Sequence, residues 1–475
     1  MSECCAPKDN GGQFDLAVIG AGSAGFSAAI TAAEQGAKVA LIGHGTIGGT
    51  CVNVGCVPSK ALIRATESLQ HSRTASRFAG IHGGATLEDW RSLIAQKDAL
   101  VGALRKAKYT DLLPSYNHVA YLEGRARLTK GGIQLNGELL RPNKIIVATG
   151  SSAALPSIPG IDQINYLTST EALDLKELPR SMLVIGGGYI GCELAQLFGR
   201  AGVEVTLVCR SRLLPEGEPE ISEALASFLE DEGITVRRGL AYRRIRQTAD
   251  SVILEIERQG LDESIEADTV LVATGRQPNT ADLNLAEVEV ALTPNGGICV
   301  DDHLRTSNDR IYAAGDVTGR HQFVYMAAYG AKLAALNALN GNSLSYDAIA
   351  MPAVTFTDPQ VASVGLTDGQ AVGQGVDVKT AILPLEHLPR ALAARDTRGL
   401  IKLVADRDSD RLLGAHIIAP EGCDSIQTAA VAIKQGMTTK ALAEMIFPYL
   451  TTVEGLKLAA QTFDKDVTKL SCCAG

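Results

Sequence analysis

A glycine-rich motif occurs twice in this chain, each time between an apolar run and a helix-forming run. Glycines at the first turn of a βαβ unit let the backbone approach a pyrophosphate at the N-terminus of the helix that follows. In this strand–turn–helix context the motif G-x-G-x-x-G strongly indicates dinucleotide binding. The glycines concerned are Gly20, Gly22 and Gly25 in the first copy, and Gly186, Gly188 and Gly191 in the second.

Two copies of the motif predict an α/β chain with two Rossmann-like nucleotide-binding domains. Each unit closes with a buried strand that ends in Ala-Thr-Gly, at Thr149–Gly150 and at Thr274–Gly275. Residues 310–316 are typical of one more strand of the first domain, so the second domain is expected as an insertion inside the first. The other strands of the two units are expected at residues 14–19, 38–42, 144–147, 181–185, 203–208 and 270–272.

The end of the second strand in each unit departs from the usual pattern, which places an acidic residue there for a ribose hydroxyl. The first unit has Gly43 and His44 at this point, so we expect its ribose contact to be built by another residue. At the same distance from its first glycine, the second unit has Cys209, Arg210 and Arg212. Arginines suit a 2′-phosphate, so Arg210 and Arg212 predict NADPH rather than NADH.

Two cysteines, Cys51 and Cys56, stand in a glycine-rich loop after the first unit, and a helix is expected from Pro58 to His71. Cysteines at the N-terminus of a helix feel the positive end of its dipole, which lowers the thiol pKa below its usual value of about 8.5. A buried cysteine is often only a small core residue. The position of this pair after a dinucleotide motif instead favours a redox pair or a soft-metal site.

Charge and cysteine usage exclude several classes of protein. The net charge of −9 argues against nucleic acid as a partner, and we interpret the five arginines of residues 237–246 as a solvated strand face. No apolar run approaches the roughly 20 residues of a membrane span. The first residues lack the basic and apolar regions of a signal peptide, so a cytoplasmic protein is expected. Ten cysteines among 475 residues do not make a disulfide scaffold.

From about residue 345 the sequence changes to short alternating strands followed by helices, which predicts a third, α+β domain. The chain ends with Cys472 and Cys473, a vicinal thiol pair that would act as a ligand or carrier arm. Cys4 and Cys5 are interpreted as incidental thiols, with a vestigial extra ligand pair as the alternative. The predicted boundaries are 1–150 and 276–345 for the first nucleotide domain, 151–275 for the second, and 346–475 for the third.

The stretch GTCVNVGCVPSK at residues 49–60, both glycine motifs, both Ala-Thr-Gly turns and residues 314–316 resemble the pyridine nucleotide–disulfide oxidoreductases. The resemblance covers nearly the whole chain. It implies FAD in the first domain, NADPH or NADH in the second, and a C-terminal domain that forms a homodimer. It also implies that Cys56 faces the flavin and that Cys51 meets the substrate.

The same resemblance implies roles for residues far apart in the chain. Lys60 and Glu193 look like the ion pair beside the flavin ring. Tyr189 looks like the ring that covers the nicotinamide site and moves aside for the nucleotide. Lys60 is also implied to contact the cofactor, as are Thr50, Thr149, Gly150, Gly275 and Asp316, the last through a flavin ribityl or phosphate group.

The residue at the position of the usual base indicates the substrate. Disulfide-reducing members carry a His-x-x-x-x-Glu base near the C-terminus, whereas residues 447–454 here place Tyr449 where the histidine would stand. Histidine titrates near 6.5 and tyrosine near 10, a difference of roughly 5 kcal/mol in proton affinity. A departing thiol at neutral pH needs a base near 7, so a disulfide substrate is disfavoured.

A soft metal ion leaves without needing a proton, and thiolates select soft metals. Hg(II) prefers two sulfurs in line, and the chain offers the pairs Cys51–Cys56 and Cys472–Cys473. Tyr109, Tyr449 and the tail resemble the members of the family that reduce Hg(II) to Hg(0), here as the catalytic core without a small N-terminal metal-binding domain.

In the expected scheme, NADPH reduces FAD and FAD reduces the Cys51–Cys56 disulfide. Cys472 and Cys473 of the partner subunit then pass Hg(II) to this pair, and Tyr109 and Tyr449 line the site. Two alternatives stay open. One is a disulfide reductase of the thioredoxin or glutathione type, and the other is a flavoprotein that sequesters a soft metal without turnover.

Overall fold

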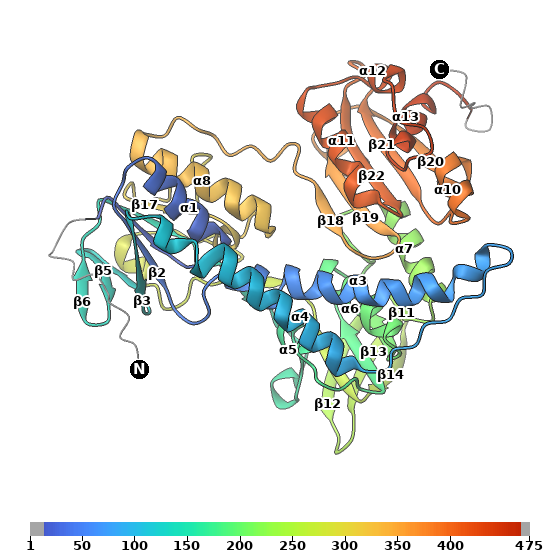
Figure 1. Cartoon of the computed structure of the whole chain (residues 1–475), viewed down its shortest axis with the longest axis horizontal. Helices are drawn as coiled ribbons and strands as arrows, with labels where there is room; N and C mark the ends of the chain where they lie inside the picture. The colour runs from blue at the N-terminus through green and yellow to red at the C-terminus, as the bar shows by residue number, and fades with distance from the viewer. Residues whose placement is uncertain (1–13, 467–475) are drawn as a thin grey trace. The chain divides into compact units, whose positions relative to one another are not determined.

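The computed structural model describes residues 14–466, which form two compact units (Figure 1). The first unit holds the described residues up to Pro58, together with 98–152 and 276–347. The second holds residues 59–97, 153–275 and the described residues from Ala348 onward. Within the described range, no helix is long and apolar enough to span a membrane.

A five-stranded parallel sheet, in the order β17-β7-β1-β2-β3, forms the core of the first unit. Strands buried on both faces need continuous apolar runs, as in β1 and β2. Helices α1 (Ser23–Glu34) and α8 (Val324–Asn340) pack against each other and share this core (Figure 1). The strands are β1 (Leu16–Ile19), β2 (Val39–Gly43), β3 (Val119–Glu123), β7 (Lys144–Val147) and β17 (Ile311–Ala313).

The position of β17 shows that the chain returns to the first sheet after the second glycine motif. Ile311 pairs with Ile145 and Ala313 with Val147 in parallel register, so this segment is one more strand of the first domain, as the sequence predicts. A small antiparallel sheet of three strands lies between β3 and β7 along the chain. Its strands are β4 (Arg127–Thr129), β5 (Gly132–Leu135) and β6 (Glu138–Leu140).

In the second unit, a four-stranded parallel sheet in the order β11-β10-β9-β15 carries the second glycine motif. Helices α6 (Tyr189–Arg200) and α7 (Pro219–Asp231) share its core. The strands are β9 (Ser181–Ile185), β10 (Glu204–Val208), β11 (Thr235–Arg237) and β15 (Thr269–Val272).

The arginine-rich stretch lies on an antiparallel sheet beside this one, made of β12 (Leu240–Gln247), β13 (Val252–Arg258) and β14 (Leu261–Ala267). Arg243 pairs with Glu257, and the Arg246 Nε lies 3.4 Å from Glu255 Oε1 on the neighbouring strand. Cross-strand acids therefore neutralise Arg243 and Arg246, and both of these residues are exposed, which confirms the prediction of a solvated strand face along β12.

The last part of the chain is an antiparallel sheet, in the order β18-β19-β22-β21-β20, with helices that share its core, which confirms the predicted α+β character. The strands are β18 (Ala353–Thr355), β19 (Gln360–Gly365), β20 (Val378–Pro384), β21 (Leu400–Asp406) and β22 (Leu412–Ala419). The helices are α9 (Asp368–Gly373), α10 (Pro389–Ala394), α11 (Gly422–Lys434), α12 (Thr439–Glu444) and α13 (Glu454–Gln461).

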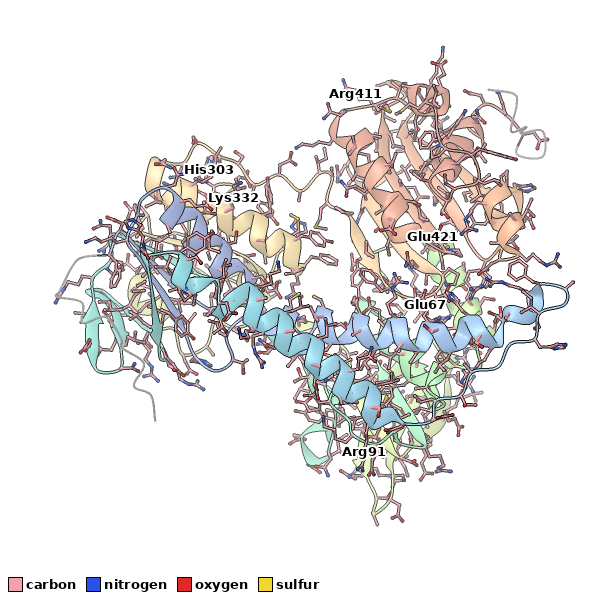
Figure 2. All side chains as sticks on the ribbon, in the orientation of Figure 1. Glu67, Arg91, His303, Lys332, Arg411 and Glu421 are labelled. Atoms are coloured by element: carbon pink, nitrogen blue, oxygen red, sulfur yellow. The ribbon has the colours of Figure 1, made fainter. Side chains whose placement is uncertain are left out.

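A buried lysine ties this sheet to the start of α7. The Lys402 Nζ donates to Glu218 at 2.8 Å, to Glu220 at 2.9 Å and to Asp368 at 2.9 Å. Charged residues of other elements, such as Arg91, Lys332 and Arg411, lie exposed at the surface (Figure 2).

Two long helices, α3 and α4, lie where the chain passes between the two units, and α3 extends beyond its expected range of 58–71 at both ends. Helix α3 runs from Cys56 to Arg73. Helix α4 (Trp90–Arg105) begins directly after Asp89, whose side chain accepts hydrogen bonds from the Arg91 N–H and the Ser92 hydroxyl. A π-helical turn, η2 (Lys106–Thr110), follows it and carries Tyr109.

Candidate functional site

The first glycine motif forms a cradle that side chains would fill. Gly20 has φ +120°, and a Cβ there would lie 2.1 Å from the Ala148 carbonyl oxygen. A Cβ on Gly25 would lie 1.7 Å from the Gly20 carbonyl oxygen. Gly22 is the extended residue before α1, so neither Gly20 nor Gly22 places a side chain in front of the N–H groups of the helix N-terminus. This arrangement fits a pyrophosphate.

The second motif has nearly the same backbone angles and the same close contacts at its glycines. Gly186 has φ +121°, and a Cβ there would lie 2.2 Å from the Ala273 carbonyl oxygen. A Cβ on Gly191 would lie 1.8 Å from the Gly186 carbonyl oxygen. Gly188 has no atom within 4 Å of its Cβ position, which leaves room for a ligand at the start of α6. The second cradle therefore also fits a dinucleotide.

Asp316 lies in a polar group of side chains in the first unit. Its Oδ2 accepts a 2.6 Å hydrogen bond from the Ser151 hydroxyl and lies 3.8 Å from the Arg276 Nε. The Thr149 hydroxyl donates to the Asn279 carbonyl at 2.7 Å beside it. The sequence prediction missed Ser151 and Arg276, although each directly follows one of the two Ala-Thr-Gly turns.

The structure explains why no acid ends the second strand of the first unit. A Cβ on Gly43 would lie 2.6 Å from the Ala21 Cβ and 2.9 Å from the Tyr121 hydroxyl. The parallel register instead places the exposed Glu123 beside Gly43, at the end of β3. Burial and the neighbouring Glu123 charge raise the pKa of Tyr121, so its hydroxyl stays protonated. Glu123 is the carboxylate available at this edge, and only the strand register reveals it.

The two arginines after β10 have different environments. Arg210 is exposed. Arg212 closes the loop to Gly217, because its Nη2 donates to the Pro215 carbonyl at 2.9 Å and to the Gly217 carbonyl at 2.7 Å. The prediction that both guanidinium groups face a 2′-phosphate therefore fits Arg210 better than Arg212.

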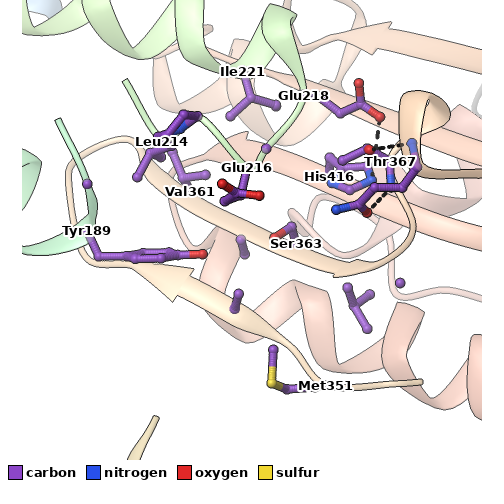
Figure 3. A pocket seen from close by; sticks show the side chains of 18 residues that line it. Tyr189, Leu214, Glu216, Glu218, Ile221, Met351, Val361, Ser363, Thr367 and His416 are labelled. Atoms are coloured by element: carbon purple, nitrogen blue, oxygen red, sulfur yellow. Dashed lines mark hydrogen bonds and ion pairs between the residues drawn. The ribbon is translucent and has the colours of Figure 1, made fainter. Parts of the chain in front are cut away.

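Tyr189 is the first residue of α6 and borders a cavity of about 190 Å³ (Figure 3). Glu216 lies on the same cavity, and burial together with the Glu216 charge raises the pKa of the Tyr189 hydroxyl. The ring keeps 39% of its surface exposed, so it lies at the edge of the second cradle beside open space.

The prediction that both cysteines lie in a loop is wrong. Gly48 and Gly49, with φ +99° and +67°, turn the chain into a short helix, α2 (Gly49–Val54), which contains Cys51. Gly55 ends it, and Cys56 is the first residue of α3. Each cysteine therefore lies in the first turn of a helix, and both are half-buried. In a sequence, closely spaced glycines indicate a loop. Here Gly48 and Gly49 adopt positive φ angles and precede the helix directly or begin it.

Backbone and side-chain hydrogen bonds attach this segment to the first cradle. The Gly48 N–H donates to the Ala21 carbonyl at 2.9 Å. The Asn53 amide donates to the Ile47 carbonyl at 2.9 Å and accepts from Arg105 of α4 at 3.0 Å. Helix α2, which contains Cys51, thus has a fixed position beside the β1–α1 turn.

Tyr109 lies against the same segment. Its ring contacts Phe26 of α1 edge-on at 4.8 Å, and its hydroxyl lies 3.4 Å from the Ser23 hydroxyl. A Cβ on Gly48 would lie 3.2 Å from the Tyr109 ring. The structure therefore brings Tyr109 next to the start of α2, as expected for a residue near Cys51.

Lys60 and Glu193, far apart in the sequence, form the ion pair that the resemblance implies. The Lys60 Nζ lies 2.7 Å from Glu193 Oε2, and the Glu193 side chain is only 6% exposed. Glu193 Oε1 also accepts from the Phe356 N–H at 2.9 Å, and the lysine lies 4.7 Å above the Phe356 ring. Phe356 was missed by the sequence prediction.

Tyr449 lies on the surface of the last part of the chain and is 54% exposed. The adjacent Leu450 donates its N–H to Glu454 Oε2 at 3.1 Å. Burial raises the pKa of Glu454. The predicted carrier residues Cys472 and Cys473 lie outside the described residues, as do Cys4 and Cys5.

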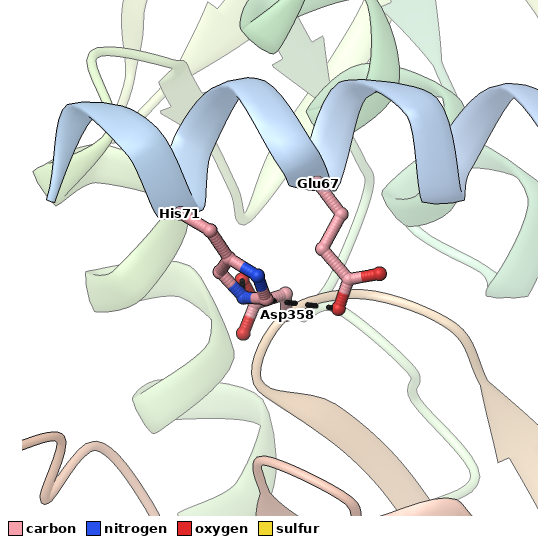
Figure 4. Close-up of side chains that lie close together, drawn as sticks. All are labelled: Glu67, His71 and Asp358. Atoms are coloured by element: carbon pink, nitrogen blue, oxygen red, sulfur yellow. Dashed lines mark ion pairs between the residues drawn. The ribbon is translucent and has the colours of Figure 1, made fainter. Parts of the chain in front are cut away.

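A group of possible metal ligands that includes two residues of α3 belongs to the structural framework instead. Glu67, His71 and Asp358 lie together (Figure 4). Arg200 already contacts Asp358 at 2.8 Å and Arg398 contacts it at 3.3 Å. These cations neutralise the carboxylate, so the group is a poor cation site.

Comparison with known proteins agrees with this geometry. Residues 14–331 match the model of the pyridine nucleotide-disulphide oxidoreductases, and residues 351–460 match the dimerisation domain of the same family. The chain therefore belongs to the pyridine nucleotide-disulphide oxidoreductase family.

Within the family, the chain is similar to several mercuric reductases. It is 48% identical to that of Lysinibacillus sphaericus over 98% of this chain and 85% of the relative. It is 46% identical to that of Streptomyces lividans over 97% and 98% of the two chains. Among solved structures, the HOCl-induced flavoprotein disulfide reductase RclA of Escherichia coli in complex with Cu(II) superposes with a TM-score of 0.83 at 30% identity, covering 95% of this chain and 99% of that one.

Proposed function

We propose that this chain is a flavoenzyme that uses NADPH to reduce Hg(II) to Hg(0). The observation that carries the proposal is the pair Cys51 and Cys56, each in the first turn of a helix and fixed beside a dinucleotide cradle. The similarity to mercuric reductases over nearly the whole chain supports Hg(II) as the substrate. Tyr449, in the position of the usual histidine base, disfavours a disulfide substrate.

The glycine cradles define where the nucleotides bind in this proposal. Residues 1–150 and 276–345 form the FAD domain, 151–275 the NADPH domain and 346–475 the dimerisation domain. FAD, when bound, relays two electrons from an NADPH hydride to the Cys51–Cys56 disulfide. Its contacts come from the first cradle with Thr50, Lys60, Thr149, Gly150 and Asp316, and those of NADPH come from the second cradle with Arg210, Arg212 and Gly275.

The cysteines handle the metal by exchange of thiolates. Cys472 and Cys473 take Hg(II) from solution thiols and pass it to Cys51 and Cys56, which hold it while two electrons convert it to Hg(0). The overall reaction consumes NADPH and Hg(II) and yields NADP⁺, Hg(0) and one proton. Thiolates suit this role because soft sulfur ligands select soft metals. Helix N-termini favour their ionised form.

The remaining site residues position the reactants. Tyr189 covers the nicotinamide position and swings aside when the nucleotide enters. The Lys60–Glu193 pair places one fixed cation and one fixed anion next to the flavin. Tyr109 and Tyr449 line the metal site and donate hydrogen bonds to thiolates during exchange.

We further propose a homodimer in which each active site draws on both subunits. The family's dimerisation domain supports the dimer. An apolar stretch around Tyr449 supports the location of its surface, since Ile446 is 97% exposed and Met445 and Leu450 more than 40%. We place the enzyme in the cytoplasm, where reducing conditions keep thiols such as Cys192 and Cys423 free.

NADPH oxidation by the purified protein in excess thiol, with and without Hg(II), tests this proposal. We expect oxidation that depends on Hg(II), with release of volatile mercury. The variant Cys472→Ala/Cys473→Ala should lose this activity most strongly when strong thiol ligands compete for the metal. Oxidation that instead depends on a disulfide, with none from Hg(II), would identify a disulfide reductase, and metal binding without turnover would identify a sequestering protein.

A further inference from the structure

Two cysteines outside the proposed active site lie under the second glycine cradle. Cys192 is in the first turn of α6 and has no exposed surface. Cys209 directly follows β10 and is 5% exposed. Both are free thiols in the same hydrophobic core. Nothing in the proposed reaction uses them.

The two thiols converge on Gly187, the middle residue of the cradle. The Cys192 thiol donates to the Gly187 carbonyl at 3.5 Å. A Cβ on Gly187 would lie 3.1 Å from the Cys209 Sγ. Burial raises the pKa of both thiols, that of Cys209 to about 11, and the proximity of Cys209 raises that of Cys192 further. In the resting protein both sulfurs therefore carry their protons.

We propose that Cys192 and Cys209 form a second soft-metal site, in which one Hg(II) ion bridges the two sulfurs and blocks binding of NADPH. Two S–Hg bonds form, two thiol protons pass to solvent, and no atom is oxidised or reduced. When the ion arrives on two small thiols, these leave with the two protons instead. Two thiolates in line are the coordination that Hg(II) favours, and soft sulfur ligands select this ion over harder ones.

The position of the pair explains the effect on the nucleotide. The Cys209 thiol donates to the Ser211 carbonyl at 3.7 Å, and the Cys192 thiol donates to Gly187. Metal binding removes both donors and inserts a large ion between the glycine turn and the strand that leads to Arg210. The pyrophosphate cradle and the exposed arginine thus shift together. Since bound nucleotide orders both loops, it should slow entry of the metal.

Entry proceeds through Cys209, because this residue keeps 5% of its surface exposed and Cys192 keeps none. The loop that follows, from Arg210 to Gly217, is held by Arg212 through two carbonyl contacts. Opening of this loop exposes Cys209 first, and transfer of the ion to Cys192 closes the bridge. Inhibition should therefore develop over time and not at once.

Binding of NADP⁺ measured by calorimetry, before and after incubation of the oxidised full-length holoenzyme with a small excess of Hg(II), tests the proposal. We expect the dissociation constant for NADP⁺ to rise about tenfold or more, as for the loss of one hydrogen bond to a charged group. In Cys192→Ala/Cys209→Ala it should stay within about twofold. Mercury analysis should find about one bound ion fewer per subunit in this variant. Prior addition of NADP⁺ should slow the loss in the wild type.

The matched control is Cys299→Ala/Cys423→Ala, which also removes two lone thiols, one exposed and one half-buried. It should lose affinity for NADP⁺ as the wild type does. Equal loss in the Cys192→Ala/Cys209→Ala variant, or unchanged affinity in the wild type, would overturn the proposal. If the double variant binds NADP⁺ poorly without mercury, Cys209→Ala alone gives the same test, because one sulfur cannot bridge. None of these readouts requires Hg(II) reduction, so failure of the proposed function would be seen separately.

Discussion

Glu193 carries two interactions that a single change can separate. Its Oε2 contacts Lys60 and its Oε1 accepts from the Phe356 N–H, with the carboxylate almost fully buried. In Glu193→Gln the amide oxygen still serves Phe356, but the lysine loses its counter-charge. We expect flavin reduction by NADPH to slow about tenfold and the free energy of unfolding to fall by about 2 kcal/mol. Stopped-flow absorbance of the flavin and thermal unfolding measure these effects.

The control for this change is Glu177→Gln, which removes the partner of Arg91 in an ion pair whose two side chains are 78% and 66% exposed. Exposed pairs contribute little, so flavin reduction and stability should stay at wild-type values. Equal rates in Glu193→Gln and the wild type would show that the ion pair only stabilises the fold.

Single residues show where sequence reasoning stops. Lys60 and Glu193 could be paired before the structure because the resemblance of their motifs to the family implies this ion pair. Glu123 could not be found, since its place beside Gly43 depends on a strand register that nothing local specifies. The contacts of Arg212 could not be predicted either. Its side chain turns back to loop carbonyls, and this contact depends on the conformation of residues 213–217.

At the scale of elements, the two cradles offer a matched pair of changes. A Cβ on Gly20 would meet the Ala148 carbonyl at 2.1 Å, and one on Gly186 would meet the Ala273 carbonyl at 2.2 Å, each from a backbone with positive φ. We expect Gly20→Ala to purify with little bound flavin. Gly186→Ala should keep its flavin and bind NADP⁺ about tenfold or more weakly. Flavin absorbance per protein and calorimetry provide the measurements.

Gly102→Ala serves as the control, because this helix residue has a negative φ and no atom within 4 Å of its Cβ position. It should leave both cofactors unaffected. Loss of flavin in Gly186→Ala as well would mean that the second cradle supports the first unit structurally. The assignment of one nucleotide to each cradle would then fail.

The elements themselves were predicted well where the apolar pattern was long. β9 (Ser181–Ile185) has the expected bounds, and β10 (Glu204–Val208) begins one residue after the expected start. The error fell at α2, where three glycines in the eight residues from Gly48 to Gly55 suggested a loop. Packing there overrides local preference, since Asn53 fixes the short helix through the Ile47 carbonyl and Arg105.

At the scale of the whole molecule, the proposed shared active site makes a prediction about mixed dimers. One subunit carries Cys51→Ala/Cys56→Ala, and the other carries Tyr449→Phe with Cys472→Ala/Cys473→Ala. Each homodimer should reduce Hg(II) poorly in excess thiol. If the tail and Tyr449 serve the partner's cysteine pair, a heterodimer purified through two different tags contains one intact site, and we expect about half of the wild-type activity per dimer. If each subunit instead uses its own tail, no intact site exists and the heterodimer stays inactive.

The exposed Ile446 beside Tyr449 provides the control, because Ile446→Asp places a charge on the apolar stretch and should prevent this rescue by separating the subunits.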